Sequence, residues 1–165
     1  MKRVFPLTSF FLLSVLPFCS FFGCSKSSDE SEQASETTPT FVDYSLAQPL
    51  EIPTLKTEKE FEDFISSCEI AVVKFGAEWC GPCCELSPEL RKQAGYFETE
   101  DVKFAEVDVD VLDSLATRMR VGSIPDIRVY YEGRPYSQIV GNYPYELANL
   151  VESLCVNKKV VQTTQ

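Results

Sequence analysis

Residues 77–83 read AEWCGPC, and this stretch decides the fold of the 165-residue chain. It follows a short apolar run at residues 70–75, which predicts a buried strand, and it precedes a segment with helical spacing. Two cysteines separated by two residues in that context are typical of a redox-active pair. Cys80 would stand at the helix N-terminus, where unpaired backbone N–H groups and the helix dipole favour a thiolate. Cys83 would follow one turn later, close enough to Cys80 for a reversible disulfide.

Strand and helix patterns alternate from residue 50 onward. Apolar runs and apolar alternation predict strands at residues 50–55, 70–75, 102–109, 127–131 and 137–140. Helical spacing predicts helices that begin at a capping box on Thr57, at Cys80 with an interruption at Pro88, at a cap on Asp110, and at Pro144. A tight turn at residues 132–133 makes the last two strands antiparallel. This order predicts an α/β fold with a central mixed β-sheet and helices on both faces.

The composition excludes several kinds of chemistry. The chain has no histidine, which removes Ser-His-Asp and Cys-His nucleophiles and every zinc or haem site that needs an imidazole. Its net charge of −10 argues against nucleic acid as a partner. A structural zinc site on Cys80 and Cys83 would need about four ligands, and the sequence has no second pair of this kind. We therefore expect no metal and no cofactor apart from a redox-active disulfide.

The chain resembles the thioredoxin family over residues 57–157. Trp79-Cys80-Gly81-Pro82-Cys83 is similar to that family's active-site sequence, and three further landmarks occur in the family's order: Pro88, the cis-proline loop Ile124-Pro125, and Gly141 after the last strand. The resemblance implies a thioredoxin fold and disulfide exchange with protein substrates. In that reaction Cys80 attacks the substrate disulfide and Cys83 resolves the mixed disulfide.

The resemblance also implies a shallow substrate groove. Its expected residues are Trp79, Gly81, Pro82, Ile124 and Pro125. A substrate segment would add there as a short strand, held by main-chain hydrogen bonds that read little side-chain identity. Gly-Pro between the cysteines is similar to the reducing members, which implies a reductase. Disulfide isomerase or oxidase, and a non-catalytic binding module, are the alternatives; a copper-handling relative would pair its cysteines with a histidine. The substrate proteins and the oligomeric state stay open.

Two positions depart from the family pattern. Six residues before Cys80, where the family has a buried Asp, this chain has Lys74, and where the family has a Lys on the following strand it has Glu106. A lone buried Lys is costly, so we expect the two residues to pair. One hypothesis makes Glu106 the proton acceptor for Cys83. The alternative leaves both residues structural, with the Lys74 ammonium extended to the solvent at the rim.

The remaining cysteines of the domain and Asp126 are not expected to take part in the reaction. Adjacent helical residues point about 100° apart, so Cys84 should face away from the disulfide as a partly exposed spare thiol; a third redox partner or an intermolecular link is the alternative. Asp126 should be solvated beside the groove, where it could also affect acidic substrates or Cys80. Cys68 and Cys155 should be buried inert thiols, with a disulfide between them as the alternative.

The N-terminus carries the features of an export signal. Lys2 and Arg3 precede an apolar run at residues 4–22. The run ends in Phe21-Phe22-Gly23-Cys24, which resembles the lipobox of bacterial lipoproteins, so Cys24 is the expected lipidation site. An uncleaved membrane anchor and a soluble secreted protein are the alternatives. All three place the rest of the chain outside the cytoplasm, because the positive charges stay inside.

The expected organisation has four parts. They are a signal peptide at residues 1–23, a flexible acidic Ser/Thr-rich tether at 24–48, a thioredoxin-like domain at 49–157 and a C-terminal tail at 158–165. The domain would be membrane-anchored and face the periplasm or extracytoplasmic space of a bacterium. A reductase there needs a membrane electron donor, as its relatives do.

Overall fold

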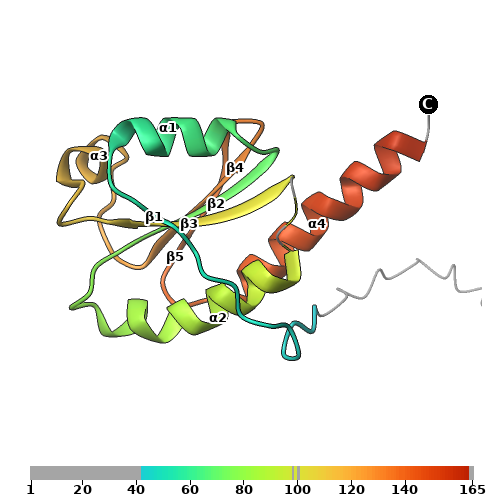
Figure 1. Cartoon of the computed structure of the whole chain (residues 1–165), viewed down its shortest axis with the longest axis horizontal. Helices are drawn as coiled ribbons and strands as arrows, with labels where there is room; N and C mark the ends of the chain where they lie inside the picture. Colours follow the sequence, from blue (N-terminus) through green and yellow to red (C-terminus); the bar gives the residue numbers. More distant parts are fainter. Residues whose placement is uncertain (1–41, 98, 100, 164–165) are drawn as a thin grey trace, which may run out of the picture. The chain divides into compact units, whose positions relative to one another are not determined.

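The core of the molecule is a five-stranded sheet (Figure 1). A computed structural model describes residues 42–97, 99 and 101–163. The strands are β1 (Thr54–Leu55), β2 (Ile70–Gly76), β3 (Val102–Asp108), β4 (Asp126–Tyr131) and β5 (Arg134–Val140), in the spatial order β1-β3-β2-β4-β5. β3 pairs in parallel with β1 and β2, whereas β4 pairs antiparallel with β2 and β5. The predicted mixed sheet is confirmed.

Helices cover both faces of the sheet. They are α1 (Glu58–Ser66), α2 (Gly81–Phe97), α3 (Asp113–Arg118) and α4 (Pro144–Thr163). In Figure 1 α1 and α3 lie on one side of the sheet and α2 and α4 on the other. Each side has its own hydrophobic cluster, because alternate residues of a strand point to opposite faces. The predicted α/β architecture is therefore confirmed.

Strand β2 lies at the centre of the sheet, between β3 and β4. All of its residues are buried, as its apolar sequence predicts for a strand covered on both faces. Its register places Lys74 directly opposite Glu106 on β3. This strand leads into the CGPC segment and so fixes the position of α2 relative to the sheet.

Helix α1 begins at its predicted cap. The Thr57 side chain accepts a hydrogen bond from the Glu60 backbone N–H at 3.1 Å. The Glu60 carboxylate accepts from the backbone N–H of Lys56 at 2.7 Å, so the reciprocal bond of the capping box forms one residue earlier than usual.

Three predicted elements differ from the structure. The first strand has only two residues, because Pro53 has no N–H for the ladder and strand pairing begins after it. Asp110 does not cap a helix: α3 begins at Asp113 after Leu112, and the Asp110 carboxylate instead accepts the Trp79 indole N–H at 2.7 Å. Helix α2 continues through Pro88, since the fully buried Leu86 and Leu90 hold the helix on both sides of it.

The two ends of the domain also extend further than predicted. Val42 and Tyr44, inside the expected tether, are buried in the cluster on the α2/α4 side. Helix α4 runs to Thr163, past the expected boundary at residue 157. Residues 1–41, including Cys24, lie outside the described part of the chain. In the described ranges we find no helix with the length and apolarity to span a bilayer.

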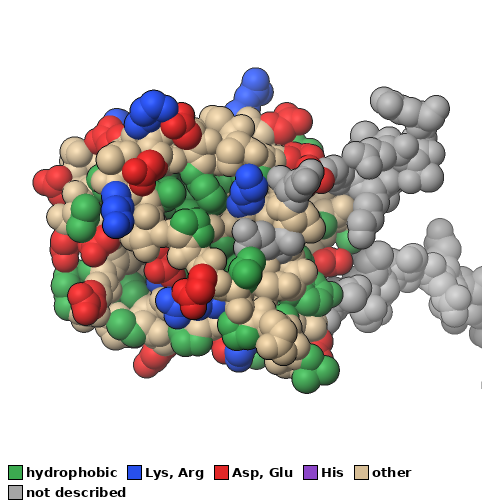
Figure 2. Space-filling model, viewed as in Figure 1, with side chains coloured by type: hydrophobic (Ala, Val, Ile, Leu, Met, Phe, Trp, Pro, Cys, Tyr) green, Lys and Arg blue, Asp and Glu red, His purple; other side chains and the backbone are tan. Residues whose placement is uncertain are grey.

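The surface carries both signs of charge. Figure 2 shows acidic, basic and apolar side chains interspersed over one face of the molecule. Some of the charges pair, as Lys59 does with Asp63 on α1. Exposed pairs of this kind add little to stability, so these charges act mainly on solubility.

Candidate active site

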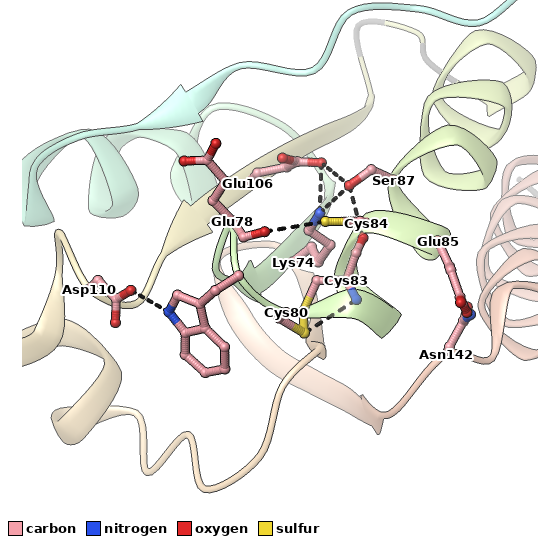
Figure 3. Close-up of a disulfide and its surroundings, with 11 residues drawn as sticks. Lys74, Glu78, Cys80, Cys83, Cys84, Glu85, Ser87, Glu106, Asp110 and Asn142 are labelled. Atoms are coloured by element: carbon pink, nitrogen blue, oxygen red, sulfur yellow. Dashed lines mark hydrogen bonds and ion pairs between the residues drawn. A yellow bond between two sulfur atoms is a disulfide. The ribbon is translucent and has the colours of Figure 1, made fainter.

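A disulfide between Cys80 and Cys83 stands at the N-terminus of α2 (Figure 3). The two Cα atoms are 5.2 Å apart. Cys80 precedes the first helical residue, and its sulfur accepts a hydrogen bond from the Cys83 backbone N–H at 3.2 Å. This is the bond that a capping side chain normally accepts. The helix end therefore offers an N–H donor and its positive dipole to negative charge on Cys80.

Two expected groove residues lie close to the disulfide. Trp79 is 71% exposed, and its bond to Asp110 holds the indole in place. Ile124 packs against the cluster formed by Ala77 and the two cysteines. Gly81 and Pro82 are exposed, whereas Pro125 is buried behind a cis Ile124-Pro125 peptide bond. The fold thus brings together the residues predicted for substrate contact; their roles stay predictions.

Lys74 and Glu106 form an ion pair behind the disulfide. The Lys74 Nζ donates to Glu106 Oε1 at 2.9 Å, and only 4% of Lys74 is exposed. The expected pairing is confirmed, and the ammonium does not extend into solvent at the rim. Sequence reasoning missed Ser87, which accepts from Lys74 Nζ at 2.6 Å and donates to the Cys83 carbonyl at 3.0 Å. Ser87 lies four residues after Cys83, so on a helix both residues are on the same face, and this spacing could have indicated the contact.

A cavity of about 200 Å³ opens behind the disulfide. It is lined by Thr54, Lys74, Gly76, Ala77, Glu78, Cys83, Cys84, Ser87, Glu106, Val107 and Asp108. The buried Cys83 and the Lys74–Glu106 ion pair therefore border the same cavity.

Cys84 is exposed, as expected. Its S–H donates to the Glu78 carbonyl at 3.4 Å, and it takes no part in the disulfide.

Asp126 differs from its prediction. It has no exposed surface and accepts two hydrogen bonds of 2.8 Å from the Arg128 guanidinium and one of 3.0 Å from Gln138. The hydrogen bonds between the Arg128 guanidinium and this carboxylate raise the pKa of Arg128. A buried carboxylate needs such partners, so Asp126 is a paired core charge and not a solvated one.

Cys68 and Cys155 lie on opposite faces of the sheet. Cys68 packs against the α1/α3 cluster and Cys155 against the α2/α4 cluster, so they do not bond to each other. Both thiols are half-buried and not fully buried as expected. Burial raises the pKa of the Cys68 thiol, which disfavours its thiolate.

The thioredoxin family model matches residues 52–153. The chain belongs to the thioredoxin family. Thioredoxin from Staphylococcus saprophyticus is 37% identical over 97 residues, which cover 58% of this chain and 91% of that protein. Thioredoxin from Coprinus comatus is 32% identical over 93 residues, covering 56% and 88%. The probable protein disulfide-isomerase A4 of Caenorhabditis elegans is 34% identical over 113 residues, which cover 67% of this chain but only 18% of that longer protein.

Solved thioredoxin structures resemble this fold. The oxidised thioredoxin from Plasmodium falciparum has a TM-score of 0.58 and 28% identity, covering 63% of this chain and 98% of its own. Thioredoxin from Trypanosoma brucei brucei has a TM-score of 0.60 and 25% identity, covering 67% and 96%.

Thioredoxin-family proteins exchange disulfides with protein substrates through a redox-active disulfide and need no cofactor. This chain has a disulfide within the matched region, at Cys80–Cys83. Its function is therefore thiol–disulfide oxidoreduction in the general sense of the family. Among the described residues no three Cys, Asp or Glu side chains form a group suited to a metal ion.

Proposed function

We propose that this thioredoxin-family protein is an exported reductase of disulfides in extracytoplasmic proteins. The observation that carries the chemistry is the Cys80–Cys83 disulfide at a helix N-terminus, beside an exposed Trp79. The export signal and the lipobox-like Cys24 support the location. In this proposal Cys24 is lipidated and a membrane protein supplies the electrons.

The reaction proceeds in two exchanges. The Cys80 thiolate attacks one sulfur of the substrate disulfide, so that a Cys80–substrate bond forms and the other substrate sulfur leaves as a thiolate. The Cys83 thiolate then attacks Cys80 Sγ; the Cys80–Cys83 bond forms and the second substrate sulfur leaves. Two electrons pass to the substrate, whose thiolates take up protons. The electron donor then reduces Cys80–Cys83 again.

Isomerase activity is the second candidate. The match to a protein disulfide-isomerase A4 favours it, as does the Lys74–Glu106 pair beside Cys83. An isomerase differs from a reductase mainly in its reduction potential, since it must leave substrates oxidised.

The deciding experiment measures the reduction potential of Cys80–Cys83 in the full-length protein, equilibrated with glutathione and analysed as alkylated peptides. A value near about −270 mV supports a reductase, and a value above about −200 mV overturns it in favour of isomerase or oxidase. Cys80→Ser should abolish exchange, and exchange that survives this change would refute the assigned nucleophile. If the wild-type protein shows no disulfide exchange with any disulfide tested, the chain acts as a binding module and not as an enzyme. Cys84→Ser is the matched control and should leave the potential unchanged.

A further inference from the structure

The loop at residues 120–125 begins and ends beside the same guanidinium. Arg128 on β4 donates from Nη2 to the carbonyl of Met119, the residue that follows α3, at 3.0 Å. The same side chain donates from Nε and Nη2 to the two carboxylate oxygens of Asp126, each at 2.8 Å. Met119 directly precedes the loop and Asp126 directly follows it. One side chain therefore holds both ends of the loop.

The Arg128–Asp126 ion pair is buried and well bonded. The Asp126 side chain has no exposed surface, and that of Arg128 is 16% exposed. Gln138 on β5 also donates to the Asp126 carboxylate, at 3.0 Å. Two parallel bonds between a guanidinium and a carboxylate fix their relative orientation, and separating such charges away from water is costly. The pair therefore joins the end of α3 to β4 and β5 in one fixed arrangement.

The middle of the loop is exposed. Arg120 and Gly122 face the solvent, and a Cβ placed on Gly122 would meet no atom within 4 Å. Arg120 has a φ of 55°, the left-handed conformation that often follows the end of a helix. Close to this helix end the Val121 N–H donates to the Ala116 carbonyl at 2.9 Å. The path of the loop therefore depends mainly on how its two ends are held.

This loop carries the main chain that the proposed reaction uses to bind its substrate. Ile124 packs against the cluster that contains Cys80 and Cys83. A substrate segment that adds as a strand binds through main-chain hydrogen bonds, which weaken steeply when donor and acceptor are misaligned. A shift of Ile124 would therefore weaken the binding of a peptide chain, while the two sulfur atoms would keep their own chemistry.

We propose that Arg128 is a positioning residue for substrate binding. Through Met119 and Asp126 it holds the loop at residues 120–125, and so it sets where the main chain of Ile124 meets the substrate. Arg128 itself contacts neither the substrate nor the reacting sulfur atoms. This inference rests on the proposed exchange reaction and adds the side chain on which its recognition of a peptide chain depends.

The test compares a protein disulfide with a small one, using the full-length protein. Insulin presents a peptide chain beside its disulfides, whereas hydroxyethyl disulfide presents none. Arg128→Met should raise the KM for insulin about tenfold and leave kcat unchanged, because the lost contacts bind substrate and transition state equally. The rate constant with hydroxyethyl disulfide should stay within about twofold of the wild-type value. Dithiothreitol regenerates the reduced protein during insulin turnover, and the reaction with hydroxyethyl disulfide is followed in a single turnover by alkylation of the remaining thiols.

This selective effect separates the proposal from a purely structural role, which would lower the rates with both disulfides. The double variant D126N/R128M leaves no unpaired charge in the core, so it should fold and show the same rise in KM if R128M does not fold. Arg134→Met, which removes an exposed arginine from β5, is the matched control and should change neither reaction.

Two results would overturn the inference. They are an unchanged KM for insulin in the folded variants, and an equal loss of rate with both disulfides. If the wild-type protein reduces neither disulfide, the proposed function is itself wrong. Wild-type activity toward both disulfides, together with unchanged variants, refutes the role of Arg128 alone.

Discussion

Two residues of β4 show how differently a buried polar side chain can be accommodated. The Asp126 carboxylate is surrounded by donors from Arg128 and Gln138. The Tyr130 hydroxyl, by contrast, is buried and has no hydrogen-bond partner within the described ranges. Burial in this apolar cluster raises the pKa of Tyr130 to about 12. The Asp126 carboxylate is thus stabilised by its partners, whereas the Tyr130 hydroxyl is removed from water with no hydrogen bond in exchange.

Tyr130→Phe should change the alkaline stability of the protein. In wild type the folded pKa of Tyr130 lies above the ordinary value of about 10, so its contribution to stability is complete below pH 10 and is lost as the pH rises toward 12. Between pH 10 and pH 12 the free energy of unfolding, measured in urea, should therefore fall further in wild type than in Y130F, by up to about 3 kcal/mol. Near neutral pH the change should be neutral or stabilising, because no hydrogen bond is broken.

Tyr136→Phe is the matched control for this prediction, since Tyr136 is 54% exposed. It should leave the pH dependence of unfolding as in wild type. Parallel curves for wild type and Y130F would contradict the prediction.

At the scale of elements, the segment at residues 42–50 packs against α2 and α4. Leu50 N–H donates to the Arg91 carbonyl at 2.9 Å, and the ring of Tyr44 lies 5.9 Å from that of Tyr145 on α4. The segment passes so close to α2 that a Cβ at Gly95 would lie 1.8 Å from the Gln48 carbonyl oxygen. Gly95 is therefore required by this contact.

Gly95→Ala should weaken the packing of residues 42–50 against α2. In an isolated helix this change would add up to about 1 kcal/mol of stability, but here the methyl group displaces the Gln48 backbone. We expect limited proteolysis to cut at residues 42–50 faster than in wild type while the rest of the domain resists. Gly122→Ala, where a Cβ meets no atom within 4 Å, is the control. Unchanged cleavage of G95A would show that the segment tolerates the methyl group.

At the scale of the whole molecule, the chain combines a compact redox domain with an N-terminal sequence that resembles an export signal. In our proposal a lipid on Cys24 attaches the protein to a membrane. One acyl chain binds membranes weakly and two or more bind stably, so attachment depends on complete modification of this residue.

Cys24→Ser should abolish labelling by a radioactive fatty acid and move the protein from the membrane to the soluble fraction, because the lipid supplies the anchor. Cys19→Ser, within the apolar run, is the control and should change neither result. A C24S protein that stays in the membrane would indicate an uncleaved anchor instead. A wild-type protein that takes up no label would refute lipidation.

Much of the fold could be predicted from local patterns. The central strand, the capped first helix and the antiparallel final hairpin depend on hydrophobic period, capping residues and turn residues that lie close together in the chain. The site predictions have the same basis, since the CGPC segment combines two thiols with a helix start. The cap on Asp110 and the interruption at Pro88 were wrong because distant contacts, with Trp79 and with the core, decide these positions.

The sequence by itself determined the family, the CGPC pair of cysteines and the complementary signs of Lys74 and Glu106, because these are properties of residue type and spacing. Only the tertiary structure decided that Ser87 joins that pair, that Asp126 is buried with Arg128, and that Cys68 and Cys155 are separated by the sheet. The physical reason is that burial and partner choice depend on which elements pack together, and strand order brings together residues that no local pattern connects.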